Sequence, residues 1–178
     1  MVPRLLTRRP AVPDPQTWTP EGTIVVQRYG ALKDVIVILY TAADADRLHP
    51  RYAVACLGCS YRESLNGAGW LSEQDAGLDA NGHASTCRAL PRGVPARPDD
   101  DTADALIRAQ VENNRVTTKA RVLHVSDALG VRVDLQRSTD WIKHALVRLA
   151  HAEPGLLTAT PEDADGSTQF AVQPSPVG

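Results

Sequence analysis

The sequence predicts an α+β protein in which two β-hairpins are each followed by helices. Two runs rich in β-branched residues, 23–29 and 34–40, have the composition of strands and enclose a short loop that begins at Gly30. A second pair of strand patterns covers residues 121–125 and 130–135. Helical patterns that begin at capping residues follow each pair, so the order of hairpin and then helix occurs twice.

The first hairpin leads into two expected helices. The run 34–40 is apolar on both faces, which is typical of a central, buried strand. Thr41 is expected to cap a short helix over 42–48 that ends before Pro50. After an extended entry to Cys56 and a loop over 61–70, the capping box that begins at Ser72 predicts a helix to about residue 88.

The second half follows the same logic. Three aspartates at 99–101 suit the N-terminus of a helix that ends near residue 114. Beyond the second strand pair, Ser138 or Thr139 caps the strongest helical pattern of the chain, which continues through residue 151. Residues 168–172 are expected to add an edge strand.

Composition allows a packed core without strong charge. Hydrophobic residues make up 43% of the 178 residues, which argues against wholesale disorder. The formal net charge of −2 gives no long-range attraction for nucleic acid. Because no apolar run approaches the ~18 residues of a membrane span, no membrane association is expected.

Prolines and composition divide the chain into four parts. Residues 1–20, rich in proline and arginine, are expected to form a flexible arm, and they lack the apolar core and cleavage site of a signal peptide. Residues 21–95 form a first α+β region and 96–173 a second, made of helix, hairpin and helix. Residues 174–178 should fray.

All three cysteines and one histidine fall in a pattern that suits metal binding. Cys56 and Cys59 form a Cys-x-x-Cys turn in which Gly58 eases the tight backbone, and His83 and Cys87 are spaced to project from one face of the expected helix. Thiolate and imidazole are the ligands that zinc prefers. Residues 21–95 are therefore predicted to be stapled by Zn²⁺. His49 is the main competitor of His83 for the fourth position.

Four protein ligands leave no open position on the metal, so the predicted zinc is structural and not catalytic. The sequence lacks the deaminase pattern of His-x-Glu followed by Pro-Cys-x-x-Cys, since Ala55 precedes Cys56, and it has no His-Glu-x-x-His and no phosphate-binding glycine loop. No catalytic residue is assigned, and the chain is not expected to be an enzyme. An odd number of cysteines argues against a secreted disulfide framework and favours the cytoplasm.

Two other functions use the same region. Cys56 and Cys59 could cycle as a redox dithiol, although the glycine-rich loop after them argues against the helix that such pairs usually begin. Alternatively, Arg88, Arg92 and Arg97 could contact a nucleic-acid backbone together with arginines of the 1–20 arm. The acidic start of the metal-bearing helix disfavours base reading, so an unknown protein partner is preferred over nucleic acid.

The Cys56–Cys59 and His83–Cys87 motifs, with the residues 88–91 that follow them, resemble those of small uncharacterised actinobacterial proteins that carry a Cys-x-x-Cys…His-x-x-x-Cys element. The resemblance covers residues 52–92, with a weaker echo around 141–158, and it implies the same four ligands but no activity. Likeness to ββα zinc fingers is looser, because 23 residues separate Cys59 from His83. The sequence thus predicts a zinc-stabilised binding or regulatory module.

Overall fold

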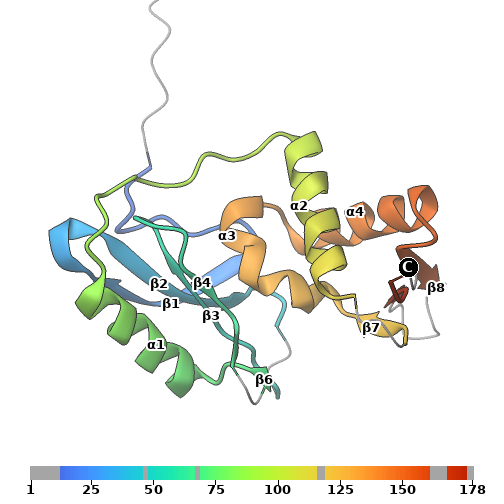
Figure 1. Ribbon diagram of the computed structural model, residues 1–178. Coiled ribbons are helices and arrows are strands. Elements are labelled where there is room, and N and C mark those ends of the chain that lie inside the picture. The colour runs from blue at the N-terminus through green and yellow to red at the C-terminus, as the bar shows by residue number, and fades with distance from the viewer. Residues whose placement is uncertain (1–12, 46–47, 67–68, 116–118, 161–167, 176–178) are drawn as a thin grey trace, which may run out of the picture.

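A computed structural model describes residues 13–45, 48–66, 69–115, 119–160 and 168–175 (Figure 1). Its helices are α1 (Glu73–Thr86), α2 (Asp100–Asn113), α3 (Arg132–Leu135) and α4 (Thr139–Ala152), with 3-10 segments η1 (Leu32–Asp34) and η2 (Val125–Val131). Its strands are β1 (Thr23–Gly30), β2 (Ile36–Ala42), β3 (Ala53–Cys56), β4 (Arg62–Glu63), β5 (Leu65–Asn66), β6 (Gly69–Trp70), β7 (Arg121–Leu123), β8 (Leu157–Thr160) and β9 (Gln169–Val172). The α+β class is confirmed.

The first half is built on an antiparallel sheet in the order β1-β2-β3-β4. One face of this sheet packs on α1 through Val37, Leu39 and Val54, and the other packs on η2 and α3 through Ile38 and Ala55. Figure 1 shows the sheet between these two layers. Burial on both faces explains why β2 is apolar at every position from residue 36 to 39, as predicted for a central strand.

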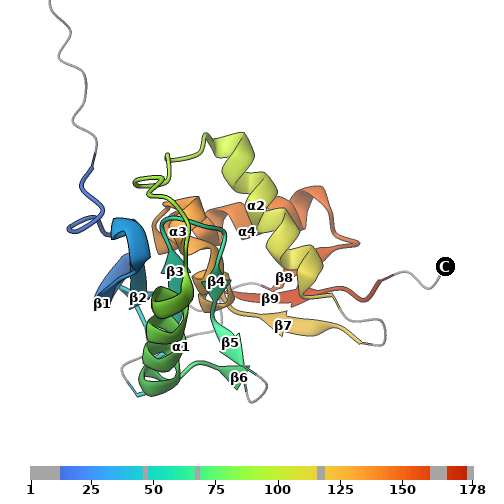
Figure 2. The ribbon, with the colours of Figure 1, turned by 60° about the vertical axis from the view of Figure 1, so that its left-hand side comes forward.

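The second half has a core of its own. β7, β9 and β8 form an antiparallel sheet in that order, and α2 and α4 lie over it (Figure 2). The helices contribute Ile107 and Ile142 to the core, and β9 contributes Phe170. As predicted, Asp99 and Ser138 cap α2 and α4, since their side chains accept hydrogen bonds from the amides of the first turn.

Two expected elements of the first half are wrong in detail. Thr41 does not cap a helix: it lies in β2, and its hydroxyl donates to the Arg51 carbonyl at 2.8 Å. Of residues 42–48, those that the structure describes form a strand end and a turn, and 46–47 lie outside the description. The expected loop over 61–70 instead carries the two-residue strands β4, β5 and β6.

The second strand expected at 130–135 is helical. Its alternating pattern of Val131, Val133 and Leu135 resembles a strand, but these residues span the end of η2 and all of α3. Val133 packs against the first sheet and Leu135 against the core of the second half, so a helical turn lets neighbouring residues serve two cores. Gln136, with φ of 47°, ends the helix in a left-handed conformation.

β7 therefore pairs with β9, far along the chain, and not with its neighbour in sequence. The strand expected at 168–172 exists as β9, but it is central and not at the edge, because β8 covers its other side. The sequence does not predict β8. Two of its residues, Ala159 and Thr160, are exposed, and its apolar signal is short.

The ends of the chain are described only in part. The arm expected over 1–20 lies outside the description up to residue 12, and the tail expected over 174–178 lies outside it from 176. Within residues 13–20, Trp18 packs against the first sheet and its carbonyl accepts a hydrogen bond from Arg28 at 2.8 Å. None of the described helices is long and apolar enough to cross a membrane.

Candidate metal centre

Two elements far apart in sequence bring the four predicted ligands together. Cys56 is the last residue of β3, and Cys59 follows in the turn that leads to β4. His83 lies in the last turn of α1, and Cys87 is its C-cap residue. One ligand atom from each side chain can be chosen so that all four lie within 4.8 Å of one another, close enough to hold a metal ion.

The shape of α1 explains why its end reaches the turn. The Ser72 hydroxyl accepts a hydrogen bond from the Asp75 amide at 3.2 Å and so starts the helix as the capping pattern predicts. Ala76, Ala80 and Ala84, spaced four residues apart, form its buried face. Such small side chains let the helix axis approach the sheet closely. Cys87 follows Ala84 by three residues, so it continues the same face of the helix.

Gly58 is required by its surroundings and not by its backbone angles. An added Cβ at this position would lie 2.7 Å from both Val35 methyl carbons and 3.2 Å from the Ala89 Cβ. Gly58 is not among the described residues with positive φ. The sequence pattern therefore pointed to the right residue, but the reason is close packing below the turn.

Backbone amides in the turn point at the sulfurs. The Gly58 amide donates to Cys56 Sγ at 3.4 Å, and the Tyr61 amide donates to Cys59 Sγ at 3.5 Å. Such donors favour the thiolate form that a metal requires. Burial acts in the opposite direction and, as the largest effect, raises the pKa of Cys56 to about 11. Metal binding must therefore displace a proton from this thiol.

His83 is held in a ligand-competent state. Its ring stacks on Tyr61 with the centroids 4.0 Å apart and an angle of 11° between the planes. Nε2 lies 3.4 Å from Cys59 Sγ. Burial lowers the pKa of His83, so the imidazole is neutral near pH 7 and carries a free lone pair.

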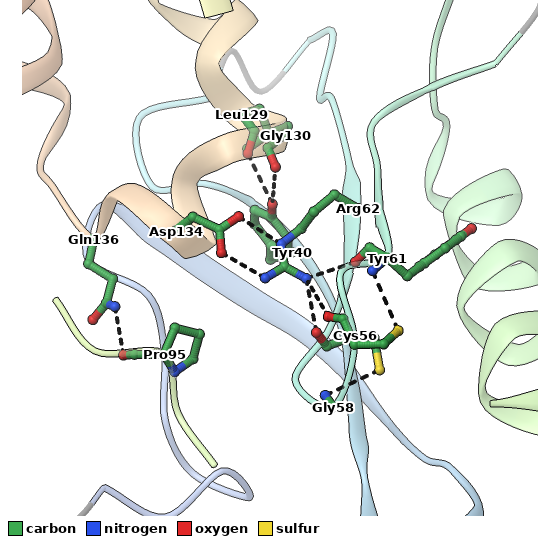
Figure 3. Close-up of polar contacts among 11 residues, drawn as sticks. Tyr40, Cys56, Gly58, Tyr61, Arg62, Pro95, Leu129, Gly130, Asp134 and Gln136 are labelled. Atoms are coloured by element: carbon green, nitrogen blue, oxygen red, sulfur yellow. Dashed lines mark hydrogen bonds and ion pairs between the residues drawn. The ribbon is translucent and has the colours of Figure 1, made fainter. Parts of the chain in front are cut away.

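The turn is also held from its other side, by Arg62 (Figure 3). Its Nη1 donates to the carbonyls of Cys56, Cys59 and Tyr61 at 2.9, 3.3 and 2.8 Å. Its Nε and Nη2 donate to the two carboxylate oxygens of Asp134 in α3 at 2.9 and 2.7 Å. The sequence alone does not point to Arg62, because an arginine three positions after a cysteine carries no signal of its own.

The remaining predicted residues lie elsewhere. His49, the alternative ligand, lines a separate cavity of about 230 Å³ together with Asp44, Arg51 and Ser126, so the structure favours His83. The three arginines suggested for nucleic-acid binding, Arg88, Arg92 and Arg97, are all exposed. Arg97 already pairs with Glu21 at 2.6 Å.

Comparisons with protein-family models, with curated proteins and with solved structures find no match to this chain. The geometry of the site itself therefore indicates its class. Three thiols and one imidazole, half-buried or buried, converge on one point. This arrangement can saturate the coordination of a tetrahedral metal ion with protein atoms alone.

Proposed function

We propose that Cys56, Cys59, His83 and Cys87 bind one structural Zn²⁺. The observation that carries this proposal is the spacing of the donor atoms. With Zn–S bonds of about 2.3 Å and Zn–N bonds of about 2.0–2.1 Å, a tetrahedron separates two sulfurs by about 3.8 Å, and a sulfur from a nitrogen by about 3.6 Å. Cys56 Sγ lies 3.9 Å from Cys87 Sγ, and Cys59 Sγ lies 3.4 Å from His83 Nε2.

The donor types favour zinc over other ions. Hard cations such as Mg²⁺ and Ca²⁺ take oxygen ligands, whereas a tetrahedral set of three thiolates and one imidazole suits Zn²⁺. All four positions come from the protein, so no coordination site remains for a reacting water. The zinc would stabilise the fold by joining the end of β3 to the end of α1, and the protein would act as a non-enzymatic module.

We further propose that this module has a binding or regulatory role with a protein partner in the cytoplasm, where thiols stay reduced. Two large apolar side chains support a protein partner: Leu78 on α1 and Leu90 just after it are exposed to 65% and 66%. The outer surface of α1 also begins with the acidic residues Glu73 and Asp75, which would repel a phosphate backbone.

A nucleic-acid-binding regulator is the second candidate, because Arg88 and Arg92 are exposed and follow the ligand Cys87 by one and five residues. A redox dithiol is less favoured. Reactive cysteines have a lowered pKa and often sit at a helix N-terminus, whereas Cys56 is fully buried at the end of a strand and burial raises its pKa.

Native mass spectrometry of the full chain tests the metal. The wild type should carry one equivalent of zinc, and Cys56→Ser should lose it. His49→Ala, which removes the histidine of the separate cavity, should keep it. A metal-free wild type with a reversible Cys56–Cys59 disulfide would establish the redox function instead. Salt-dependent retention of double-stranded DNA that weakens in Arg88→Ala and Arg92→Ala would favour nucleic acid over a protein partner.

A further inference from the structure

Arg62 lies between the second half of the chain and the turn at residues 56–61 that carries Cys56 and Cys59, the metal turn. It contacts both with one guanidinium group. We propose that Arg62 is the positioning residue that couples metal binding to the docking of η2 and α3 on the first sheet. In this mechanism zinc strengthens the contact between the halves, and the Arg62–Asp134 pair strengthens zinc binding in return. The inference rests on the proposed zinc site and concerns its regulation.

Hydrogen bonds hold the metal turn from two sides. On the metal side, the amides of Gly58 and Tyr61 point at the sulfurs of Cys56 and Cys59. On the other side, three carbonyls of the same turn converge on Nη1 of Arg62. These bonds fix five of the six peptide units between Cys56 and Arg62, and because each unit is planar, few dihedral angles of the turn stay free. A shift of the guanidinium therefore moves the amides that orient the sulfurs.

Charge also links Arg62 to the metal centre. Zn²⁺ with three thiolates and a neutral imidazole has a net charge of −1, since two positive charges meet three negative ones. Cys56 and Cys87, two of the ligands, are buried, where an uncompensated charge is costly. The Arg62 cation binds the carbonyl of the ligand Cys56 at 2.9 Å and so lies next to this negative centre. The attraction links Arg62 to the metal centre, whereas Asp134, itself an anion, contributes by holding the guanidinium in position.

Arg62 contacts the second half of the chain through Asp134, next to other contacts of η2 with the first half. Asp134 belongs to α3, and its two carboxylate oxygens accept from Nε and Nη2 in a fork that only a guanidinium can form. η2, directly before α3, accepts a hydrogen bond at its Leu129 carbonyl from the buried Tyr40 hydroxyl at 3.0 Å. An added Cβ at Gly130 would lie 2.8 Å from the Ser64 hydroxyl, so the chain after β4 abuts η2 directly.

Thermodynamic linkage makes the effect reciprocal, and its size can be estimated from other metal sites. If zinc strengthens the Arg62–Asp134 contact, that contact must strengthen zinc binding by the same factor. Groups that hold metal ligands without touching the metal change affinity by about 10- to 100-fold. Asp134 is one step further from the metal than Arg62, so we expect about a tenfold loss of zinc affinity when its charge is removed.

The test compares zinc affinity in two variants that each break a bidentate arginine–carboxylate pair. Asp134→Asn breaks the pair with Arg62. Glu153→Gln breaks the pair between Arg108 and Glu153, which has the same fork geometry at 2.8 Å but lies between α2 and the end of α4. Competition with a chromophoric chelator measures zinc dissociation. Hydrogen exchange of the η2 and α3 amides, with and without zinc, measures docking of the second half.

Coupling predicts about tenfold weaker zinc binding in Asp134→Asn and unchanged binding in Glu153→Gln. Zinc should slow amide exchange in η2 and α3 of the wild type and have little effect there in Asp134→Asn. Arg62→Lys, which keeps the charge but lacks the fork, should behave like Asp134→Asn. Circular dichroism of each zinc-loaded variant checks that it is folded.

The outcomes separate the two proposals. If the wild type binds no zinc, the proposed metal function fails. If the wild type binds zinc through its four ligands but Asp134→Asn binds it equally well, the metal site stands and the coupling is overturned. Equal losses of affinity in Asp134→Asn and Glu153→Gln would also overturn it, because they would reflect general destabilisation.

Discussion

Gly58→Ala should destabilise the protein, chiefly through a close contact with Val35 below the metal turn. The added Cβ would lie 2.7 Å from both methyl carbons of Val35, well inside van der Waals contact. Val35 is 2% exposed and β-branched, so it has no free rotamer into which to move. Either the valine or the turn that carries Cys56 and Cys59 must shift.

The magnitude follows from two opposing terms. Overpacking a core by one methyl group costs about 1–3 kcal/mol. Alanine restricts the unfolded chain more than glycine, which returns about 0.4–1 kcal/mol. We therefore expect a net loss of about 1–2 kcal/mol in the free energy of unfolding. Val35→Ala alone should cost about 2 kcal/mol by removing two buried methyl groups. In the double variant the new methyl occupies part of that space, so the losses should fall short of additivity by about 1–2 kcal/mol.

Urea denaturation of the zinc-loaded variants, followed by circular dichroism, measures these differences. Gly82→Ala is the matched control: this glycine lies in α1, and an added Cβ there meets nothing within 4 Å. It should stabilise the protein by about 1 kcal/mol through helix propensity alone. Strictly additive losses in Gly58→Ala and Val35→Ala would refute the contact, as would a Gly58→Ala variant as stable as the wild type.

Three further predictions concern pH and capping. Burial raises the pKa of Tyr40 far above its usual value of 10, so folded protein keeps this proton when the unfolded chain loses it. Unfolding free energy should thus fall by about 1.4 kcal/mol per pH unit above pH 10, and less steeply in Tyr40→Phe, as alkaline urea titrations can measure. Because burial also raises the pKa of Cys56 to about 11, zinc affinity in chelator competition should rise at least about tenfold per pH unit between about pH 6 and 8; a flat profile would exclude thiol ligation. Ser72→Ala should cost about 1 kcal/mol in thermal or urea unfolding, since it leaves the Asp75 amide without its capping acceptor, and an unchanged stability would show that the cap contributes nothing.

Much of the fold could be predicted because its signals are local. The capping serines of α1 and α4 and the aspartate that caps α2 each sit next to the helix they begin, and their side-chain hydrogen bonds need no distant partner. The apolar run of β2 identified a central strand in the same way. The errors occur where distant packing overrides local pattern: residues 130–135 alternate like a strand but form η2 and α3 because they must reach two cores.

The candidate metal site shows the same division. The sequence predicts Cys56, Cys59, His83 and Cys87 as ligands, because their residue types and their spacing along the chain are enough to indicate metal binding. That His83 and not His49 joins the cluster was decided by the tertiary structure, which places His49 at a separate cavity.

The sequence by itself determined which atoms can bind a metal and which residues begin the helices around them. Only the tertiary structure decided what surrounds the site: Val35 below Gly58, Tyr61 against His83, and Arg62 between the turn and Asp134. These contacts join residues up to 72 positions apart. The physical reason is that capping and ligand spacing act within a few residues, whereas packing and ion pairing depend on which elements fold side by side.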